Sequence, residues 1–594
     1  MPDSRAPVFV DPALDHGVPA SVAPKVADLT KMLSIAVIAI ALMTGAALRV
    51  VRLNQVPPAL NQDEAVAGYD AYSILKTGRD HHGNFMPIIM QGFNDYRMPL
   101  FTYSLLPLVG ALGLKTSVVP LCAALWGIVD LAALTVLAGL IWGWPGAAAA
   151  ALIGTLMPWH LELSRYGIEA TSASATISLG LVSFFLWLER RRDAWILLSC
   201  AFFALSLYSY SVAQASVPLL CVLLAVLYWP ELKQLRVRTA LVALAIGFTL
   251  ALPLALSSLK SSTTMMTEYH HLSLFNPATI CPGCDKERAD LASSSIFGLL
   301  AANFASYFSP AFLFLQGSMG DHWTLLHPPG FGELLPEQAP LILLGLGALL
   351  IRRRRKIALL ILGWLVFAVL PATLILPLGA SYPEHRALPT PNVLFDYSVP
   401  PAQVTPALLL THPDSRHAIL SMAPWIMLSA LGFVVLLDLT SRAPTLRMAA
   451  VALLLVGVIF HGGRFARSYF RDFPRIAAPY FQYGIKEFIG AIDQRYDRKL
   501  PVIITSNINQ PYIYVLFFER YSPAAFQRGP VFQRTGEFGP VLHFDRYWFL
   551  PPNWAYPRAA HGIFVFRGID PTPKPPDVLI HYPDGTVAYK IVVK

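Results

Sequence analysis

The chain has 594 residues, of which 45 are Lys or Arg and 36 are Asp or Glu, and its formal net charge is +9. Charged residues make up 14% of the chain and hydrophobic residues 55%, whereas a typical soluble domain carries roughly 25% charged residues. Such a composition excludes an ordinary soluble enzyme and a disordered chain. It predicts a polytopic α-helical membrane protein.

The basic residues fall in short clusters between long apolar stretches. This distribution is typical of the signals that orient membrane helices, and it differs from the continuous basic face of a nucleic-acid-binding protein. We therefore expect a lipid bilayer, and no nucleic acid, among the partners of this chain.

Apolar runs of spanning length recur along the chain, since a transmembrane helix needs about 20 apolar residues. Residues 1–31 lack the features of a cleaved signal peptide and are expected to form a cytoplasmic segment before an uncleaved first helix. The expected spans are residues 32–51, 118–141, 146–162, 171–188, 194–211, 214–230, 239–257, 335–351, 357–377, 418–438 and 447–461.

The orientation depends on one short apolar stretch, residues 99–114, which Pro107 and Gly110 interrupt. If this stretch lies in the membrane interface, four basic clusters fall on one side, which must be the cytoplasm. If it spans, the clusters lie opposite the N-terminus. We expect the first arrangement, with about eleven helices in the plasma (inner) membrane. The clusters are Arg190 to Arg192, Lys233 with Arg236 and Arg238, Arg352 to Lys356, and Arg442 with Arg447.

This threading divides the chain into a transmembrane catalytic domain, residues 32–462, and an extracytoplasmic tail, residues 463–594. Within the first domain, residues 52–117 and 258–334 become large outer loops. In the tail, apolar residues recur at helical spacing from Tyr480 to Ile492. Five runs of the tail are typical of strands, which predicts a small α/β domain. These runs are residues 501–505, 512–518, 563–566, 578–581 and 587–593.

The first outer loop carries two adjacent acids, Asp63 and Glu64, directly after the first span. The following residues have a weakly amphipathic helical pattern, so Asn61 or Asp63 can cap a helix here. A carboxylate at the membrane–water boundary can also take a proton from an incoming hydroxyl group. We expect Asp63 and Glu64 to be catalytic, with helix capping as the alternative for Asp63.

Further polar residues lie near the expected ends of other spans. Arg165 and Glu169 are one helical turn apart and can form a simple ion pair. Arg165 can instead bind a lipid phosphate through two parallel hydrogen bonds, or extend to the interface without a specific partner. The same alternatives apply to Arg416. Tyr210 lies at the outer end of the fifth span, where a place in the interfacial aromatic belt is the alternative.

The cysteines predict no catalytic chemistry. Cys281 and Cys284 form a CPGC pair in the second outer loop, and a disulfide is expected there in an oxidising compartment. A zinc site is the alternative, but it needs two more ligands and the nearby histidines have no motif spacing. No spacing elsewhere demands a metal, so we predict no metal site and no cofactor, and leave room for a divalent cation.

Several motifs occur in an order that resembles a family of membrane enzymes. The DE pair is followed by GYDAYSILKTGRDHHGNFMP and DYRMPLFTY, SRYGIEA follows the third span, YFSPAFLFLQG and GFGELL lie in the second outer loop, and SRHAILSMAPWIMLSALG opens the tenth span. This order is similar to that of the GT-C integral-membrane glycosyltransferases, in particular the PMT-like group of protein O-mannosyltransferases and lipid A aminoarabinose transferases. The resemblance covers residues 32–460.

The resemblance implies an inverting transfer of a sugar from a polyprenyl-phosphate carrier to a hydroxyl group of a glycolipid, glycan or protein at the outer membrane face. Asp63 then corresponds to the acid that activates the acceptor, and Glu64 to its neighbour in the same motif. The donor phosphate is expected to face Arg165, Arg416 and Arg97. The residues expected to position the substrate are Tyr69, Asp95, Glu169 and Tyr210. The MIR-type insertion of eukaryotic mannosyltransferases is absent, which weakens the case for a protein acceptor.

Two functions of other classes remain as alternatives. A transporter or flippase of a lipid-linked saccharide predicts polar residues in mid-span and internal repeats, but Asp130 and Asp438 are the main mid-span acids. A receptor or assembly scaffold accounts for the tail but not for the long first loop. A nucleotide-sugar donor is not expected, since no Gly-rich phosphate loop is present.

Overall fold

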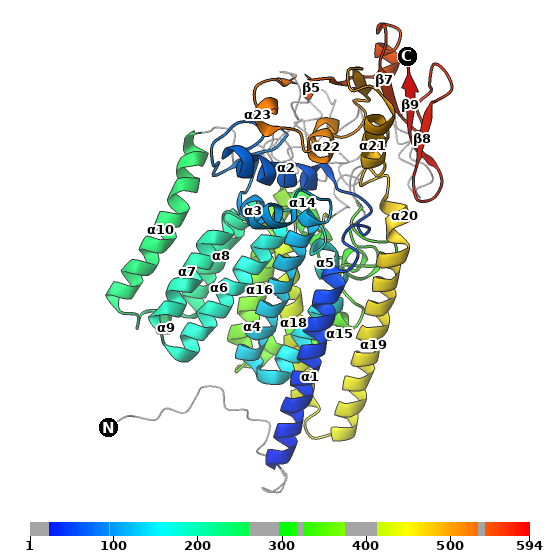
Figure 1. Cartoon of the computed structure of the whole chain (residues 1–594). Coiled ribbons are helices and arrows are strands. Elements are labelled where there is room, and N and C mark those ends of the chain that lie inside the picture. The colour runs from blue at the N-terminus through cyan, green and yellow to red at the C-terminus, as the bar shows by residue number, and fades with distance from the viewer. Residues whose placement is uncertain (1–22, 94–95, 261–295, 319–324, 375–412, 533–540) are drawn as a thin grey trace.

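The computed structural model is a bundle of long helices with a small sheet domain at one end (Figure 1). We call this end of the bundle the α2 end, because helix α2 (Gln62–Thr77) also lies there. The structure describes residues 23–93, 96–260, 296–318, 325–374, 413–532 and 541–594.

Each apolar run expected to span contains a helix. Within the described residues, seven helices are long and apolar enough to cross a membrane, and five shorter apolar helices accompany them. Length alone therefore supports seven crossings and leaves the predicted count of about eleven open. The main helices are α1 (Ala23–Val50), α4 (Val118–Leu156), α6 (Ala170–Arg190), α7 (Asp193–Ser206), α8 (Ser211–Leu227), α10 (Val237–Lys260), α14 (Ile296–Ser306), α15 (Gln338–Gly347), α16 (Arg355–Val369), α18 (Met422–Leu439) and α19 (Pro444–Arg471).

Helix α4 is a hairpin of two helices. Gly143 has φ 71° and ψ −162°, a conformation outside the helical region, and Pro145 follows it. A Cβ atom on Gly154 would lie 2.8 Å from the side chain of Leu131, so the two arms pack closely against each other. The 39-residue element therefore supplies two antiparallel helices, as the runs 118–141 and 146–162 predict.

Ion pairs join the basic connectors to one another. Lys356 Nζ lies 2.9 Å from Glu231 Oε1, and Arg354 Nη2 lies 2.5 Å from Asp438 Oδ2. These pairs bring the connector before α16 together with the connector that follows α8 and with the last turn of α18. The three segments therefore share the end of the bundle opposite α2 (Figure 1).

Helix α3 (Leu100–Leu112) lies directly below α2 at the α2 end (Figure 1). With 13 residues it is about 20 Å long, which is shorter than the hydrocarbon core of roughly 30 Å. This length supports the interfacial placement predicted for residues 99–114.

A buried polar chain crosses the interior of the bundle. The Arg49 guanidinium lies 2.6 Å from His160 Nδ1, and His160 Nε2 lies 3.5 Å from Asp130 Oδ2. Ser174 and Ser178 each donate a hydrogen bond of 2.6 Å to the same carboxylate. The chain ties α1, α4 and α6 together through α5 (Pro158–Leu163), so Asp130 has structural partners on three sides.

The C-terminal segment folds as a mixed sheet with helices, which confirms the predicted α/β domain. The strand order is β4-β5-β6-β3-β7-β9-β8, and the central strand β3 pairs in parallel with β6 and β7. Helix α19 continues through position 462, where the sequence placed the domain border, as far as Arg471. The strands are β3 (Val502–Ile504), β4 (Val531–Phe532), β5 (Val541–Phe544), β6 (Tyr547–Phe549), β7 (Ile563–Arg567), β8 (Val578–His581) and β9 (Val587–Val593).

One predicted strand of this domain is wrong. Residues 512–518 lie in helix α22 (Pro511–Phe518), which starts with a proline and is buried on almost all sides. A short apolar run fits either a buried strand or a buried helix, because burial on every face removes the periodicity that separates them. The helix packs against α2 so closely that a Cβ on Gly68 would lie 2.7 Å from the Phe517 ring.

Candidate functional site

The start of α2 is fixed by a capping box. The Asn61 side chain accepts a hydrogen bond of 2.6 Å from the backbone N–H of Asp63, and the Glu64 side chain accepts one of 3.1 Å from the backbone N–H of Asn61. Asn61 is therefore the cap of this helix. The carboxylate of Asp63 is left for other contacts, near the positive end of the helix dipole.

Asp63 forms an ion pair with Arg97 from β2 (Tyr96–Arg97). Arg97 Nη2 lies 2.5 Å from Asp63 Oδ1, and Nη1 donates to the Asp63 carbonyl at 3.2 Å. The Asp63 side chain remains 27% exposed. Among the described residues, no hydrogen bond is recorded to its second oxygen, Oδ2. The result is an oriented, partly exposed carboxylate whose Oδ2 accepts no hydrogen bond from the described residues.

Glu64 has the opposite environment, although it is the next residue. Its side chain is fully buried, and Oε1 accepts a hydrogen bond of 2.7 Å from the backbone N–H of Gly167. Burial raises the pKa of Glu64 to about 8. Glu64 therefore joins the start of α2 to the loop between α5 and α6.

The C-terminal domain holds α2 from above (Figure 1). Tyr69, expected to position the substrate, is buried and donates from Oη to the Tyr521 carbonyl at 2.9 Å. Gln527 Nε2 lies 2.8 Å from the Asp80 carbonyl and 3.2 Å from Ser73 Oγ. These contacts give Tyr69 a place in the domain interface.

Arg165, expected at the donor phosphate, is fully buried. Its guanidinium donates to the carbonyls of Leu48, Arg49 and Val56 at 2.6, 3.0 and 2.7 Å. It therefore satisfies two carbonyl groups of the last turn of α1, which lack partners inside the helix, and one carbonyl of the loop that follows. A phosphate has no access to this side chain in the structure.

Arg416, the second arginine expected at the phosphate, pairs with an acid two residues away. Its Nη2 lies 2.5 Å from Asp414 Oδ2, and its side chain is 14% exposed. Burial opposes ionisation of Asp414, but Arg416 and His417 together hold the pKa of that carboxyl well below its usual value. The pair lies directly before η8 (Ile419–Ser421) and α18.

A buried pair of acids lies nearby that the sequence did not single out. Burial raises the pKa of Glu333, which accepts a hydrogen bond of 2.8 Å from the Ser318 backbone and interacts with Glu162. Neither Glu162 oxygen accepts a hydrogen bond within the described ranges of the chain, and His327 Nε2 is 3.8 Å from Glu333 Oε1. The two acids are far apart in the sequence and have no common motif, so only the fold brings them together.

The remaining expected site residues are dispersed. Glu169 is half-buried at the start of α6, and Tyr210 is buried at the start of α8. Asp95 lies outside the described residues, as do Cys281 and Cys284. The structure therefore brings Asp63 and Arg97 into contact, with Glu64 beside them, and does not bring the whole expected set together.

No metal centre is evident in the part of the chain that the structure describes. Groups of three or more His, Cys, Asp or Glu side chains able to hold a metal ion do not occur there. The three cysteines of this part, Cys122, Cys200 and Cys221, are free thiols.

Comparisons with known proteins gave matches among solved structures only. No model of a protein family matches the chain, and no curated protein matches it. The chain is similar to ArnT from Cupriavidus metallidurans bound to undecaprenyl phosphate, with a TM-score of 0.46 and 12% identity over 94% of this chain and 97% of that one. The apo state of the same protein gives a TM-score of 0.45 and 13% identity over 90% and 92%.

A second protein with a similar structure is the oligosaccharyltransferase of Archaeoglobus fulgidus in its apo form. The TM-score is 0.44 and the identity 13%, over 82% of this chain and 64% of that one. At these scores and identities the similarity carries no argument for an activity, which has to rest on the geometry of the site.

Proposed function

We propose that this chain is a GT-C-type membrane glycosyltransferase. It moves a sugar from a polyprenyl-phosphate-linked donor to a hydroxyl group of a glycan, lipid or protein acceptor. The single observation that carries the proposal is the carboxylate of Asp63, which Arg97 orients and which stays partly exposed at the α2 end of the bundle.

The position of Asp63 supports this chemistry. Its helix lies on α3 at the α2 end, above the long apolar helices (Figure 1). A lipid-linked donor presents its sugar at this level, while a polar acceptor arrives from water. Arg97 has a positioning role in the proposal, because it touches the carboxylate and not the transferred sugar.

The proposed reaction is a single inverting displacement. The acceptor oxygen attacks the anomeric carbon opposite the phosphate, and the bond between that carbon and the phosphate oxygen breaks. Its electron pair leaves with the polyprenyl phosphate, while Asp63 Oδ2 takes the acceptor proton. A phosphate leaving group needs little acid assistance, so the two-carboxylate scheme of glycosidases does not apply.

Arg416 is the residue we propose for the leaving phosphate, as it is partly exposed at the start of the segment leading into α18. Stabilising charge that develops in the transition state is a large catalytic effect. Arg165 is left out of this role, because backbone carbonyls occupy its guanidinium. In the same proposal, Glu64 supports the position of its neighbour.

The proposed setting is the plasma membrane, with residues 1–31 in the cytoplasm and the α2 end outside. The connectors joined by the Lys356–Glu231 and Arg354–Asp438 pairs support this orientation, because basic connectors face the cytoplasm. The transmembrane domain then carries the site, and the sheet domain covers it from outside.

The test is transfer in liposomes that contain labelled polyprenyl-phosphate sugars. Replacing Asp63 by Asn keeps the size of the side chain and removes the base, and general-base help is worth about 100- to 10,000-fold. We expect Asp63→Asn to lose activity by that factor, with release of polyprenyl phosphate as the readout. Asp497→Asn, at an exposed site of the sheet domain, is the matched control.

Near-normal transfer by Asp63→Asn would remove this residue from the mechanism. Movement of the labelled lipid across the bilayer without release of polyprenyl phosphate would favour a flippase. Mass spectrometry of envelope lipids and glycans from cells with and without the protein then identifies the sugar and the acceptor.

A further inference from the structure

The end of α19 that leads to the sheet domain carries a row of arginines. Arg464, Arg467, Arg471 and Arg475 follow one another at intervals of three, four and four residues. At 100° per residue these intervals keep the side chains on one face of the helix and its continuation α20 (Phe473–Ala477). All four are exposed. We call them the arginine row.

Little negative charge balances this row. Among the described residues, no ion pair is recorded for any of the four guanidinium groups, and Asp472 is the one acid within the segment. Cationic side chains are normally concentrated on the cytoplasmic side of a membrane protein. The arginine row lies instead at the α2 end, so a partner with negative charge is expected there.

The depth of the row matches the level of lipid headgroups. Arg464 is 20 residues beyond Pro444, the first residue of α19, which corresponds to about 30 Å along the helix axis. This distance is close to the thickness of the hydrocarbon core. When α19 spans the bilayer, Arg464 and Arg467 therefore lie where lipid phosphates lie.

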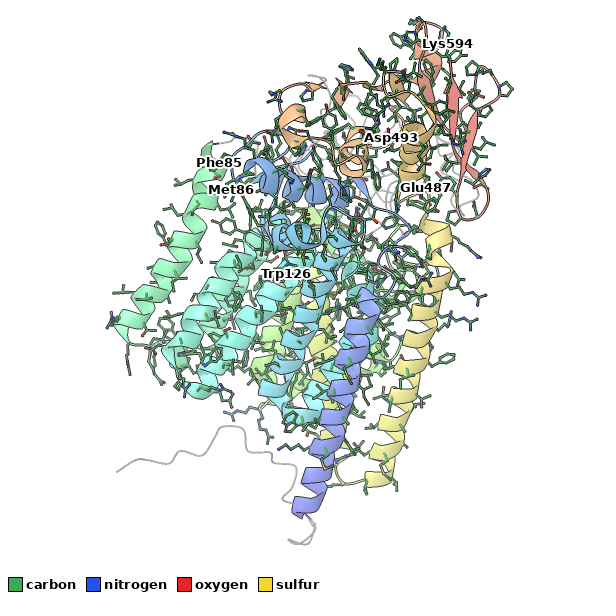
Figure 2. All side chains as sticks on the ribbon, in the orientation of Figure 1. Phe85, Met86, Trp126, Glu487, Asp493 and Lys594 are labelled. Atoms are coloured by element: carbon green, nitrogen blue, oxygen red, sulfur yellow. The ribbon has the colours of Figure 1, made fainter. Side chains whose placement is uncertain are left out.

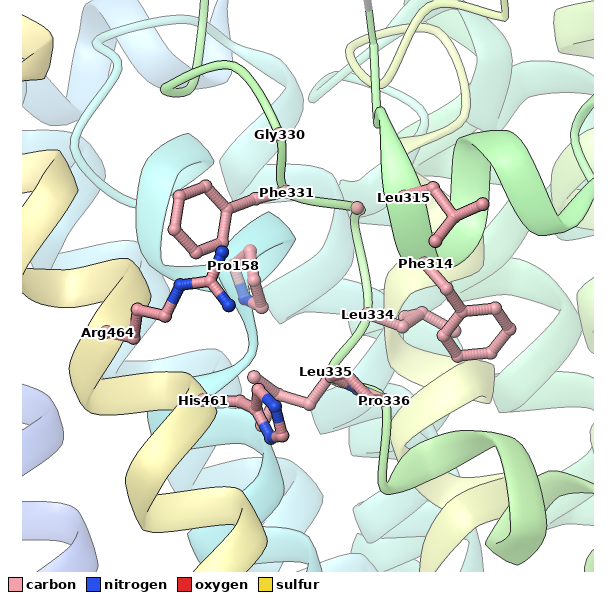
Figure 3. A pocket seen from close by; sticks show the side chains of 11 residues that line it. Pro158, Phe314, Leu315, Gly330, Phe331, Leu334, Leu335, Pro336, His461 and Arg464 are labelled. Carbon is pink, nitrogen blue, oxygen red and sulfur yellow. The ribbon is translucent and has the colours of Figure 1, made fainter.

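A cavity opens beside the first arginine of the row. Figure 3 shows Arg464 and His461 on α19 facing the loop around Phe331, with Pro158 behind. The cavity measures about 270 Å³, and most of its lining is apolar. The Arg464 guanidinium lies 5.2 Å from the centre of the Phe331 ring. The cavity thus combines one cation with an apolar wall, which suits an amphipathic ligand.

The second polar group of the cavity, His461, already has a partner inside the chain. His461 Nδ1 lies 2.6 Å from Glu337 Oε1. Among the described residues Arg464 forms no ion pair, so it is the cation of the cavity that can face an anionic headgroup.

Below the row, α19 presents apolar side chains to its surroundings. The helix is peripheral in the bundle (Figure 1), and only 11% of its most apolar window is buried inside the chain. The exposed side chains include Leu453, Val456, Ile459 and Phe460, which are 53–74% exposed. This face is suited to acyl chains, directly beneath cations suited to their headgroups.

We propose that the arginine row and the adjoining cavity bind an anionic phospholipid of the bilayer. The phosphodiester contacts Arg464 and Arg467, and an acyl chain lies along the apolar face of α19 with its upper part in the cavity. Arg471 and Arg475 contact the anionic headgroup above the phosphate. The site lies on the periphery of the bundle, so it exchanges lipid with the whole leaflet.

The experiment uses the full-length purified protein in native mass spectrometry and thermal unfolding. The probes are phosphatidylglycerol, phosphatidylcholine and polyprenyl phosphate, each added alone. We expect the wild type to retain phosphatidylglycerol in preference to phosphatidylcholine and to unfold at a higher temperature when it is present. Arg464→Ala combined with Arg467→Ala should lose both effects.

The control is Arg528→Ala, which removes an exposed arginine of the sheet domain and should change neither effect. The double variant must unfold like the wild type in phosphatidylcholine, so that a general folding defect is separated from loss of lipid. If it does not, Arg464→Lys and Arg467→Lys keep the charge and should retain phosphatidylglycerol.

Two results would overturn the proposal. The first is equal retention of phosphatidylglycerol by the wild type and the double variant. The second is a preference for polyprenyl phosphate over phosphatidylglycerol that the double variant abolishes, which would assign the row to the carrier lipid. Both readouts are independent of glycosyl transfer, so they do not depend on the proposed function.

Discussion

Two adjacent acids at the start of α2 have different environments, and these environments separate their roles. Asp63 is partly exposed and paired with Arg97, whereas Glu64 is buried and bonded to the backbone of Gly167. The pattern of a DE pair marks the position of both residues in the sequence. The pattern does not show which of the two carboxylates is exposed, because the burial of Glu64 depends on a loop about 100 residues further along the chain.

The buried acid gives a prediction about pH. Glu64 keeps its proton in the folded chain up to about pH 8, whereas its ordinary pKa is 4.5. Between these values unfolding releases a proton, so this residue makes the folded state less stable as pH rises. Glu64→Gln cannot titrate, and it should unfold with a weaker dependence on pH across this window.

The measurement is the thermal unfolding of both proteins in nanodiscs at a series of pH values. Glu487→Gln serves as the control, since Glu487 is exposed on the sheet domain (Figure 2). If Glu64→Gln and the wild type follow parallel curves, Glu64 is ionised in the folded chain and its burial does not raise its pKa into this range.

At the scale of elements, the main result is that the C-terminal domain fastens α2. Helix α22 packs on α2. Gln527 donates to three acceptors around the C-terminal end of α2, namely Ser73 Oγ, Thr77 Oγ1 and the Asp80 carbonyl. The sequence of this domain contains none of the expected catalytic residues, but its contacts with α2 give it a structural role. It holds the helix that carries Asp63.

Removing the contacts between Gln527 and α2 should make α2 less ordered and glycosyl transfer slower. Gln527→Ala removes the side-chain donor of the Asp80 carbonyl, which keeps the Gly83 backbone N–H as a donor. Loss of one part-buried hydrogen bond of this kind costs about 0.5–1.5 kcal/mol. We expect faster proteolytic cleavage near α2, measured by limited digestion, and slower transfer in the liposome assay. Gln494→Ala, at an exposed helix position, should resemble the wild type. Unchanged cleavage in Gln527→Ala would mean that α2 is held without this side chain.

The elements were predictable from the sequence to different degrees. The spans, the helix near residue 485 and the strands β3, β7, β8 and β9 follow from periodicity. Helix α22 could not be predicted in this way, because it is buried on almost all sides and its apolar residues therefore show no helical periodicity. The contacts of Arg165 and the Glu162–Glu333 pair could not be predicted from the sequence either, because each joins segments that only the folded bundle brings together.

At the scale of the whole molecule, the two ends of the bundle differ in charge and in covering. Exposed Phe85 and Met86 lie on the loop beyond α2, level with the top of α10 (Figure 2). Leu350, which is 91% exposed, lies beside the basic connector before α16 at the other end. These positions allow the two faces of the membrane to be labelled separately.

The proposed orientation predicts the outcome of such labelling. In a variant without native cysteines, Phe85→Cys should react with a membrane-impermeant maleimide in intact cells. Leu350→Cys should react only after the membrane is permeabilised. Transfer activity of the cysteine-free protein is the control for folding. Labelling of Leu350→Cys in intact cells, with Phe85→Cys protected, would place Asp63 on the cytoplasmic side. It would contradict the proposal that transfer occurs at the outer face.

The fastening of α2 has a consequence for the way the protein is made. Tyr69 bonds a residue that lies 452 positions later in the chain. A ribosome working at roughly 5–20 residues per second needs about 20 to 90 s to cover that interval. During this time a nascent chain already carries Asp63 without the partners that hold its helix. The chain can therefore become active in glycosyl transfer only when its synthesis is almost finished. Fragments that end before Tyr521 should be inserted into the membrane but should show no transfer activity.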